Sequence, residues 1–315
     1  INIKGLAHKL GLSVSSVSRA LNGYDNISQQ TKDKIFKTAK KYNYFPDLNA
    51  RRLASKKNDT IAFISSIDPE APDHVVLQFL AGITLGIKNT NTELITKFCL
   101  NEDEEMNYFK KLISTGQADK FIFYKIKKND ERVTFLNEKG IKFVTWGRTN
   151  KQKDHAWIDL DNKKSIDLLM NKLSNNGHKR IAFINVHRSF NYGAQRKIAY
   201  ESSVKNLQLQ FSKDYYQDSL IETVESGLAL TNYLLGLKKP PTAIICSHLR
   251  FFTGCLLKCQ DLKLNIGQDI SVVGFNDQDS YLSSQNLTYI SHPLMEMGKR
   301  SVKMLQDLDQ DIPIS

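Results

Sequence analysis

The sequence of 315 residues lacks several features that whole classes of protein need. It has no run of 18 or more apolar residues, so it predicts no membrane span. Its first residues, INIKGLAHKL, lack the long apolar core of a secretory signal, and we expect a cytoplasmic protein without a membrane partner. The length exceeds what one ordinary core supports, and 41% hydrophobic with 24% charged residues is typical of a folded protein of two or three domains.

Cysteine is scarce, and its distribution does not predict a disulfide framework. The four residues Cys99, Cys246, Cys255 and Cys259 stand in apolar surroundings, which indicates reduced, buried thiols. Cys255 and Cys259 are four apart on an expected helix and could share a metal. No Cys or His pair with ligand spacing accompanies them, so we expect neither a metal nor another cofactor.

Catalytic motifs are missing as well. The sequence contains no phosphate-binding loop of the G-x-x-x-x-G-K type, no G-x-S-x-G elbow and no H-E-x-x-H. His155 lies near Asp159 and Asp161, but this loose grouping is more typical of a surface or a crossover. We therefore expect no catalytic residue, and we do not expect an enzyme.

Acidic residues are few in one part of the chain only. Residues 1–60 hold 12 Lys or Arg against 4 Asp or Glu, whereas the remaining residues hold 32 against 29. A basic block can be a solvated face or a disordered tail, so the pattern within it decides.

The basic block contains residues that are typical of the ends of three short helices. Asn2 can cap the first and Gly11 can end it, Ser13 can cap the second, and Ser28 can precede the third. The Asn22-Gly23 pair supplies the stop of the second helix. A tight turn between the first two helices predicts a helix-turn-helix. The apolar positions expected to face its core are Ile3, Leu6, Ala7, Leu10, Val14, Val17, Ala20, Leu21, Ile35, Phe36, Ala39 and Tyr42.

The second helix carries polar residues off its apolar stripe. Hydroxyls and backbone amides at a helix start suit phosphate oxygens, and Arg19 has the side chain best shaped to grip a guanine edge. A plain surface helix is the alternative, but the basic block and the turn favour DNA recognition. The candidate DNA-binding residues here are Val14, Ser15, Ser16, Ser18, Arg19, Asn22, Ser28 and Thr31.

From Thr60 onward, short apolar runs alternate with amphipathic segments. TIAFISS, ELITKFCL, KFIFYKI, KFVTWG, RIAFIN, TAIICS and ISVVGF predict buried parallel strands, and residues 75–90 and 163–176 predict crossover helices. This is a doubly wound α/β pattern that occurs twice. Ligands in such folds bind beyond the carboxyl ends of the strands, so the cleft between two lobes is the natural site.

Five motifs in order carry a resemblance to a known family. With LAHKLGLSVSSVSRALNG, TKDKIFKTAKKYNYFPDLNARRLAS, NNGHKRIAFI, DISVVGFND and HPLMEMGKRSV the chain resembles the lactose and galactose repressor (LacI/GalR) transcription factors. The resemblance implies an N-terminal all-α helix-turn-helix DNA-binding domain, a hinge helix and a two-lobed α/β effector domain like those of periplasmic sugar-binding proteins. The boundaries expected are 1–46 for the first domain, 47–59 for the hinge helix and linker, and 60–315 for the effector domain, with lobe 1 at about 60–158 and 290–310 and lobe 2 at about 159–289.

The hinge is expected in FPDLNARRLASKKND. Pro46 marks an extended junction, and the helix after it is too short to be stable alone because nucleation is costly. The resemblance implies that two such helices pair in the minor groove, where Leu53 wedges into a base step with Ala50 beside it. A mere basic linker is the alternative.

The effector site rests mainly on the resemblance. Arg196 matches the Arg that grips the ligand in this family, and a forked cation suits sugar hydroxyls or a carboxylate. Asn276 stands where many members carry an Asp, and its amide can both donate and accept. Trp146 could stack on a sugar face or belong to the core. Further candidates are Ser66, Arg148, Asp161, Glu222 and His248.

Two of these candidates depart from the family pattern. His248 stands where an Asn or Ser is usual, and Glu222 stands where an aromatic residue is common. Aromatic, polar and bidentate groups around a cleft favour a sugar, and GFND resembles galactose-type members, so a galactoside is the first expectation. A purine-type corepressor is the alternative.

The expected mechanism links the two domains. An effector acts only through its different affinity for the DNA-competent and incompetent arrangements of the lobes. A twofold protein matches a pseudo-palindromic operator, so we expect a homodimeric repressor whose dimer face includes residues 75–90. A periplasmic sugar-binding protein without a DNA function shares the two-lobed fold, but it has no use for a basic helix-turn-helix.

Overall fold

The computed structural model describes residues 1–21, 24, 26–44, 59–67, 74–151, 155–275, 287–310 and 312. Contacts divide the chain into two compact units, Ile1–Asn58 and Asp59–Ser315. The predicted hinge residues Ala50 and Leu53, the helix stop at Asn22 and the candidate Asn276 all lie outside the described residues.

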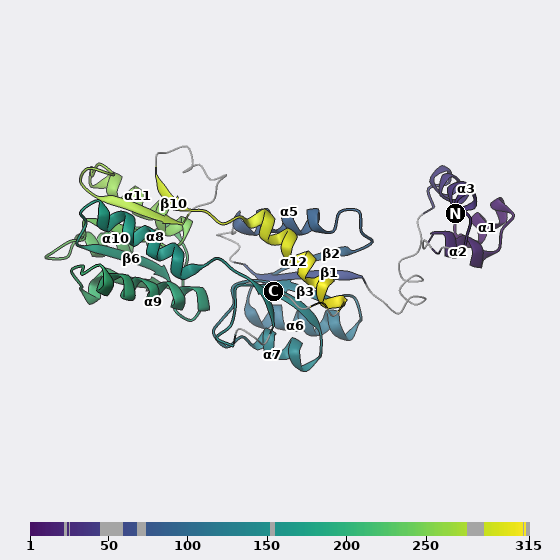
Figure 1. Cartoon of the computed structure of the whole chain (residues 1–315), viewed down its shortest axis with the longest axis horizontal. Coiled ribbons are helices and arrows are strands. Elements are labelled where there is room, and N and C mark those ends of the chain that lie inside the picture. Colours follow the sequence, from purple (N-terminus) through teal and green to yellow (C-terminus); the bar gives the residue numbers. More distant parts are fainter. Residues whose placement is uncertain are drawn as a thin grey trace. The chain divides into compact units, whose positions relative to one another are not determined.

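The described part of the first unit folds into the helices α1 (Ile3–Leu10), α2 (Val14–Leu21) and α3 (Gln29–Lys41) (Figure 1). The side chain of Asn2 caps α1 by accepting from the Gly5 N–H at 2.9 Å, and Gly11 ends it in the left-handed conformation with φ of 64°. Only glycine adopts that conformation without a steric penalty. The predicted caps and turn therefore form a helix-turn-helix around a small apolar core.

Two aromatic residues expected in that core lie outside it. Ile35 and Ala39 of α3 are buried, but Phe36 is 49% exposed and Tyr42 is 38% exposed. Phe36 follows Ile35 directly, so the helix turns it about 100° away from the buried stripe. The Tyr42 ring instead receives the Lys9 ammonium at 4.6 Å from its centroid, a cation–π contact at the surface.

The second unit begins with a five-stranded parallel sheet in the order β2-β1-β3-β4-β5. Its strands are β1 (Thr60–Ser66), β2 (Glu93–Cys99), β3 (Lys120–Phe123), β4 (Lys142–Trp146) and β5 (Ala156–Ile158). The expected strand over 120–126 ends early, because Lys125 turns into the left-handed region with φ of 58°. The edge strand β2 is mostly half-buried rather than buried, since only one neighbour covers it.

Helices cover both faces of this sheet, which defines the first lobe. One core cluster packs α5 (His74–Gly86) and α12 (Leu294–Asp309) against it, and another packs α6 (Glu102–Ser114) and α7 (Glu131–Glu138). Parallel strands buried on both faces explain the apolar runs read from the sequence.

A second parallel sheet has the order β10-β9-β8-β6-β7 and defines the second lobe (Figure 1). Its strands are β6 (Ile181–Val186), β7 (Tyr216–Ser219), β8 (Ala243–Cys246), β9 (Ser271–Phe275) and β10 (Thr288–Ile290). One face packs on α8 (Asn162–Asn175) and α9 (Asn191–Asn206), the other on α10 (Val224–Leu235) and α11 (Leu249–Asp261), and a short 3-10 helix (Lys213–Tyr215) precedes β7.

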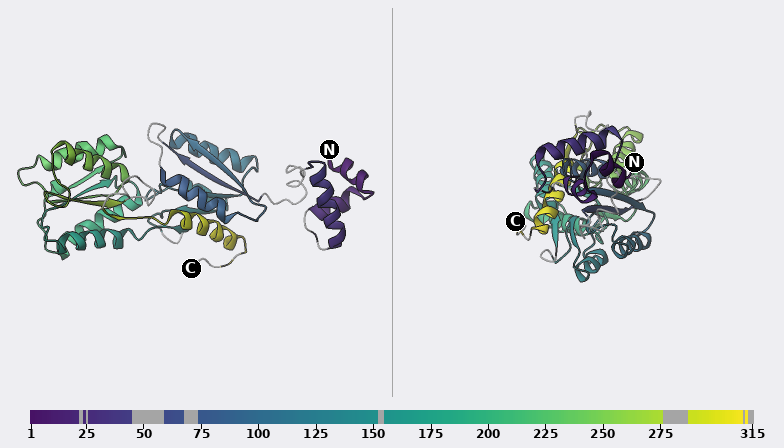
Figure 2. Two further views of the ribbon diagram at one scale, coloured as in Figure 1. Left: turned by 90° about the horizontal axis from the view of Figure 1, so that it is seen from above. Right: turned by 90° about the vertical axis from the view of Figure 1, so that its right-hand side faces the viewer.

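The chain reaches the second lobe after β5 and returns to the first through α12. Figure 2 shows α12, in yellow, beside α5 on the first lobe. Glycines allow this close packing, because a Cβ added to Gly82 would strike the Met295 carbonyl and one added to Gly298 would strike the Phe79 carbonyl. The first lobe is therefore built from two distant parts of the sequence.

The four cysteines are buried and free, in agreement with the reduced thiols expected. Within the described ranges no group of three His, Cys, Asp or Glu side chains is placed to hold a metal ion. None of the helices described is both long and apolar enough for a membrane crossing.

Candidate functional site

The exposed side of α2 carries the candidate DNA-reading residues. Ser13 caps the helix, since its Oγ accepts from the Ser16 N–H at 3.0 Å and shares a 2.9 Å bond with the Ser16 hydroxyl. Val17 and Ala20 are fully buried, which turns Ser15 and Arg19 outward. Val14 is 40% exposed, so it belongs to this outward face rather than to the core, while Ser16 and Ser18 are half-buried at its border.

The start of α3 adds hydroxyls. The Ser28 side chain accepts from the Thr31 N–H at 3.3 Å, and the two hydroxyls lie 2.8 Å apart. Each hydroxyl keeps hydrogen-bonding capacity beyond this cap, so the predicted phosphate contact is compatible with the capping role. The first turn of α3 has no acidic residue that would repel a phosphate.

The second unit has a cavity around the guanidinium of Arg196, on α9. We call it the inner cavity; its volume is about 90 Å³. Both lobes contribute to it. Its lining residues are Val75, Tyr124, Lys125, Trp146, Gly147, Asp159, Tyr192, Arg196, Glu222, Ser247, His248 and His292.

Arg196 is 4% exposed and is held in a fixed orientation. Its Nε donates to Asn162 Oδ1 at 2.8 Å, and its Nη1 donates to the Ser247 carbonyl at 2.9 Å. The guanidinium lies 3.9 Å from the centroid of the Phe275 ring. Burial lowers the pKa of Arg196 to about 10, which still leaves it charged at neutral pH.

A carboxylate faces Arg196 from the segment before α10. Glu222 Oε1 accepts from the Tyr192 hydroxyl at 3.2 Å, and Oε2 lies 3.3 Å from Lys125 Nζ and 4.0 Å from His248 Nε2. Burial favours the neutral form, but His248 and Lys125 more than offset it, so the pKa of Glu222 lies below its usual range. Because Lys125 follows β3, this ion pair joins the two lobes.

A second carboxylate, Asp159, lies at the crossing after β5. It is 3.2 Å from Arg148 Nε and accepts from the Leu160 N–H at 2.9 Å. Burial raises the pKa of Asp159 to about 6, although Arg148 and Arg196 oppose this shift. The site therefore holds a carboxyl group that titrates close to neutral pH.

Aromatic rings form the first-lobe side of the inner cavity. Trp146 stacks on Phe79 at 4.9 Å and on Tyr124 at 5.4 Å between centroids. Trp146 is thus a core residue that also lines the cavity, and its stacking on a sugar face stays a prediction. His292, beside it at 6.3 Å, has its pKa lowered to about 3 by burial and by Arg196, and stays neutral.

Three predicted effector residues do not line the inner cavity. Asp161 is exposed and caps α8, accepting from the Lys164 N–H at 2.9 Å, because the chain between β5 and α8 turns Asp159 inward instead. Ser66 ends β1, and its N–H donates to Glu105 Oε2 at 3.1 Å. Arg148 does not line the cavity; it supports it through Asp159 and through Gln195 at 3.2 Å.

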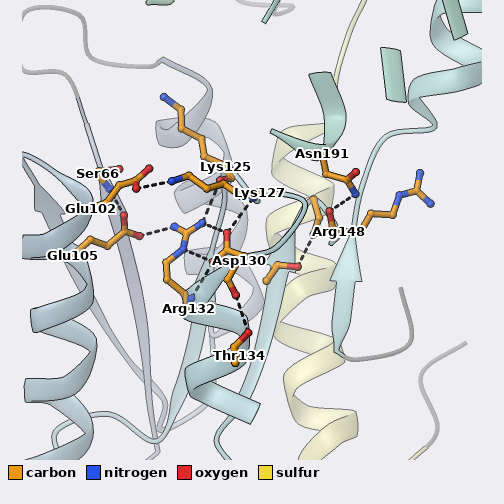
Figure 3. A network of polar contacts seen from close by, with 12 residues as sticks. Ser66, Glu102, Glu105, Lys125, Lys127, Asp130, Arg132, Thr134, Arg148 and Asn191 are labelled. Atoms are coloured by element: carbon orange, nitrogen blue, oxygen red, sulfur yellow. Dashed lines mark hydrogen bonds and ion pairs between the residues drawn. The ribbon is translucent and has the colours of Figure 1, made fainter. Parts of the chain in front are cut away.

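Ser66 lines a larger space, a groove of about 910 Å³ formed by the start of α6, residues 125–132 and Phe190. We call it the polar groove. Figure 3 shows the network beneath it, in which Arg132 bonds to Asp130 at 2.8 and 2.9 Å, to Glu105 at 2.7 Å and to the Lys125 carbonyl at 3.2 Å. The network therefore fixes the backbone that places Lys125 in the inner cavity.

Several lining residues were not predicted. Asp159, Tyr192, His292 and Lys125 come from loops or helix starts in both lobes. Tyr192 is within four residues of Arg196 on the same helix, a spacing that places both on one face and could have indicated it. The others follow strand ends, where only the alignment of strands in the two sheets brings them together.

Comparisons with known proteins agree with this architecture. The family profile of bacterial regulatory proteins, lacI family, matches residues 2–47, and that of the periplasmic binding protein-like domain matches residues 170–314. The chain is 29% identical over 317 residues to the HTH-type transcriptional regulator AglR of Rhizobium meliloti (strain 1021), covering 97% of this chain and 87% of AglR. It is 27% identical over 312 residues to the HTH-type transcriptional regulator RegA of Clostridium saccharobutylicum, covering 96% and 91%.

Solved structures show the same fold. A regulatory protein of LacI family from Chloroflexus aggregans superposes with a TM-score of 0.74 at 26% identity over 82% of this chain and 93% of that one. The lac repressor dimer bound to operator and the anti-inducer ONPF gives a TM-score of 0.84 at 21% identity over 98% and 92%. The chain thus combines a DNA-binding domain of the lacI family of bacterial regulatory proteins with a periplasmic binding protein-like domain, and it is a DNA-binding transcriptional regulator.

Proposed function

We propose that the chain is a cytoplasmic repressor whose operator binding is controlled by a sugar in the inner cavity. The observation that carries this proposal is the buried Arg196 guanidinium, which shares one cavity with two carboxylates and with aromatic rings. Fixed charged donors and acceptors beside aromatic faces suit a neutral molecule with many hydroxyls. The inner cavity contains both the charged groups and the aromatic faces.

Control of DNA binding follows from the position of the cavity between the lobes. Trp146 and Lys125 belong to the first lobe, whereas Arg196, Glu222 and His248 belong to the second. A ligand that touches both lobes binds one arrangement of them better than another, and this difference in affinity is what shifts the equilibrium. A galactoside is our first choice of sugar.

A homodimer is part of the proposal. The first-lobe helix α5 exposes Leu77 (65%) and Leu85 (47%), and the second lobe exposes Leu220 and Ile221 (63% each). Such residues support a face that a second copy covers. A twofold dimer would present two α2 helices to a pseudo-palindromic operator.

The first experiment identifies the DNA sequence that the protein binds. Selection from a random duplex pool with the purified full chain should enrich a pseudo-palindrome, whose binding is then measured by fluorescence anisotropy. Sugars, sugar phosphates and purines are screened by thermal shift, and a sugar that raises the melting temperature should release the selected duplex.

Two variants locate the response. Arg196→Met should remove the thermal shift and the release, while Arg300→Met, at an exposed position of α12, should keep both. A purine that shifts and releases where no sugar does would overturn the sugar assignment. A response retained in Arg196→Met would place the site elsewhere.

A further inference from the structure

The inner cavity is small for a ligand site. Its volume of about 90 Å³ lies below the roughly 300–1,000 Å³ of ordinary small-molecule pockets. The polar groove, at about 910 Å³, lies within that range. A molecule anchored at Arg196 therefore has little room in the inner cavity itself, whereas ample room exists in the groove.

Two features connect these spaces. Lys125 lines both of them. Phe190 lines the groove and stacks on Tyr192 of the inner cavity, with centroids 5.6 Å apart and planes 26° from parallel. Half-buried Phe190 thus continues the aromatic lining of the cavity into the groove.

The floor of the groove is preorganised, and the charges that line the groove nearly balance, with five carboxylates against four cationic side chains. Glu105 is 1% exposed and Asp130 is 4% exposed, and both pair with Arg132 (Figure 3). Each Glu105 oxygen accepts one bond, from Arg132 Nη1 and from the Ser66 N–H. A carboxylate has about four acceptor sites, so Glu105 can also accept from hydroxyl groups. Paired charges with spare acceptor sites suit a neutral polyol rather than an ion.

We propose that the effector is an oligosaccharide of two or more units: one unit is held at Arg196, and the next passes Lys125 onto Phe190 in the polar groove. This inference rests on the proposed sugar control and adds the length of the sugar to it.

Isothermal titration calorimetry of the full chain against matched series tests the proposal. The series are galactose, melibiose and raffinose; glucose, maltose and maltotriose; and glucose, cellobiose and cellotriose. In the series that binds, we expect the disaccharide to bind at least about tenfold more tightly than its monosaccharide, since one added aromatic contact contributes on that order.

Two pairs of variants assign that gain to the groove. Phe190→Leu should lower the affinity for the longer sugar by roughly fivefold more than it lowers the affinity for the monosaccharide. Phe211→Leu, at a 60% exposed position outside both spaces, is its control. Asn107→Trp fills the groove from the exposed side of α6 and should also remove the gain, whereas Lys111→Trp, on the same helix but outside the groove, should keep it.

The outcomes separate the two proposals. If a monosaccharide binds as tightly as its longer relatives, the oligosaccharide inference is wrong and the sugar control stands. If a length preference survives both Phe190→Leu and Asn107→Trp, the second unit lies elsewhere and the inference fails. Absence of binding by every sugar overturns the sugar control and the inference together.

Discussion

Arg19 and Arg196 show how differently the two units of this regulator use the same side chain. Arg19 stands exposed on α2, above a core whose buried residues are aliphatic. Arg196 is buried on α9, bonded to Asn162 and to the Ser247 carbonyl and packed on the Phe275 ring. The first is available for a partner, whereas the second is already part of the fold.

This difference predicts whether substitutions in each unit change binding alone or change stability as well. Residues on the exposed face of α2 can change without leaving a buried group unpaired, so their effects should appear in binding alone. Residues of the inner cavity and of the Arg132 network are buried and bond to one another, so removing one partner leaves the others unpaired. Their effects should appear in stability as well.

The largest expected effect concerns DNA binding by the exposed residue Arg19. Arg19→Ala should cost about 1–3 kcal/mol at each half-site of the selected duplex, because a bidentate base contact is lost. Anisotropy measures the affinity, and the melting temperature should remain unchanged. Lys37→Ala, an exposed control on α3, should weaken all duplexes alike and lower the salt dependence. Unchanged specific affinity in Arg19→Ala would reject the recognition helix.

A substitution in the buried Arg132 network tests the expected effect on stability. Arg132→Met leaves Glu105 and Asp130 without their cation and should lower the free energy of unfolding by about 3–5 kcal/mol. Urea denaturation measures this. Lys163→Met removes an exposed pair with Asp167 and should leave the free energy of unfolding nearly unchanged, because solvent screens the pair. Equal costs for the two variants would remove the distinction between buried and exposed charge.

The raised pKa of Asp159 gives a pH signature. A carboxyl whose folded-state pKa is raised from 3.8 to about 6 loses its contribution to stability as the pH rises through that interval. Between pH 4 and pH 7, the free energy of unfolding of Asp159→Asn should therefore rise relative to that of the wild type by about 2 kcal/mol, at about 1.4 kcal/mol per pKa unit over the part of the interval above pH 4. The difference between the two proteins isolates Asp159 from His292, whose lowered pKa acts in the opposite direction. A constant difference across this range would contradict the assignment.

The smallest effect concerns the ion pair between the lobes. Lys125→Met should change the free energy of unfolding by about 1 kcal/mol or less, because Lys125 is 26% exposed and solvent screens the pair. Lys127→Met, which breaks the more exposed pair with Glu102, should cost less still. A loss of several kcal/mol in Lys125→Met would show that the pair belongs to the buried class.

The sequence predicted those parts of the molecule that local rules determine. Asn2, Gly11 and Ser13 act at the helix ends where capping rules placed them, and the long apolar runs became strands. The short strands β5, β7 and β10 were missed because each has only three or four residues and none of these residues is fully buried. Their pairing depends on sheet neighbours rather than on their own composition.

The candidate site was harder to predict for the same reason. Arg196, Glu222, His248 and Trp146, four of the predicted effector residues, line the inner cavity, and their contact with an effector stays a prediction. Asp161 was chosen where Asp159 is the lining residue, since only the turn after β5 decides which carboxylate faces inward. Which loops meet in the cavity depends on register across two sheets, and no short stretch of sequence contains that information.

The packing of α12 on α5 has a consequence for how the protein is made. The strands and helices of the first lobe leave the ribosome early, but the helix that covers α5 is synthesised only after the whole second sheet. The second lobe, which is continuous in sequence from α8 to β10, can complete its core before that helix emerges. The nascent chain must therefore carry an uncovered apolar face of α5 for most of its synthesis, and the part of the effector domain that is made first is the last to be finished.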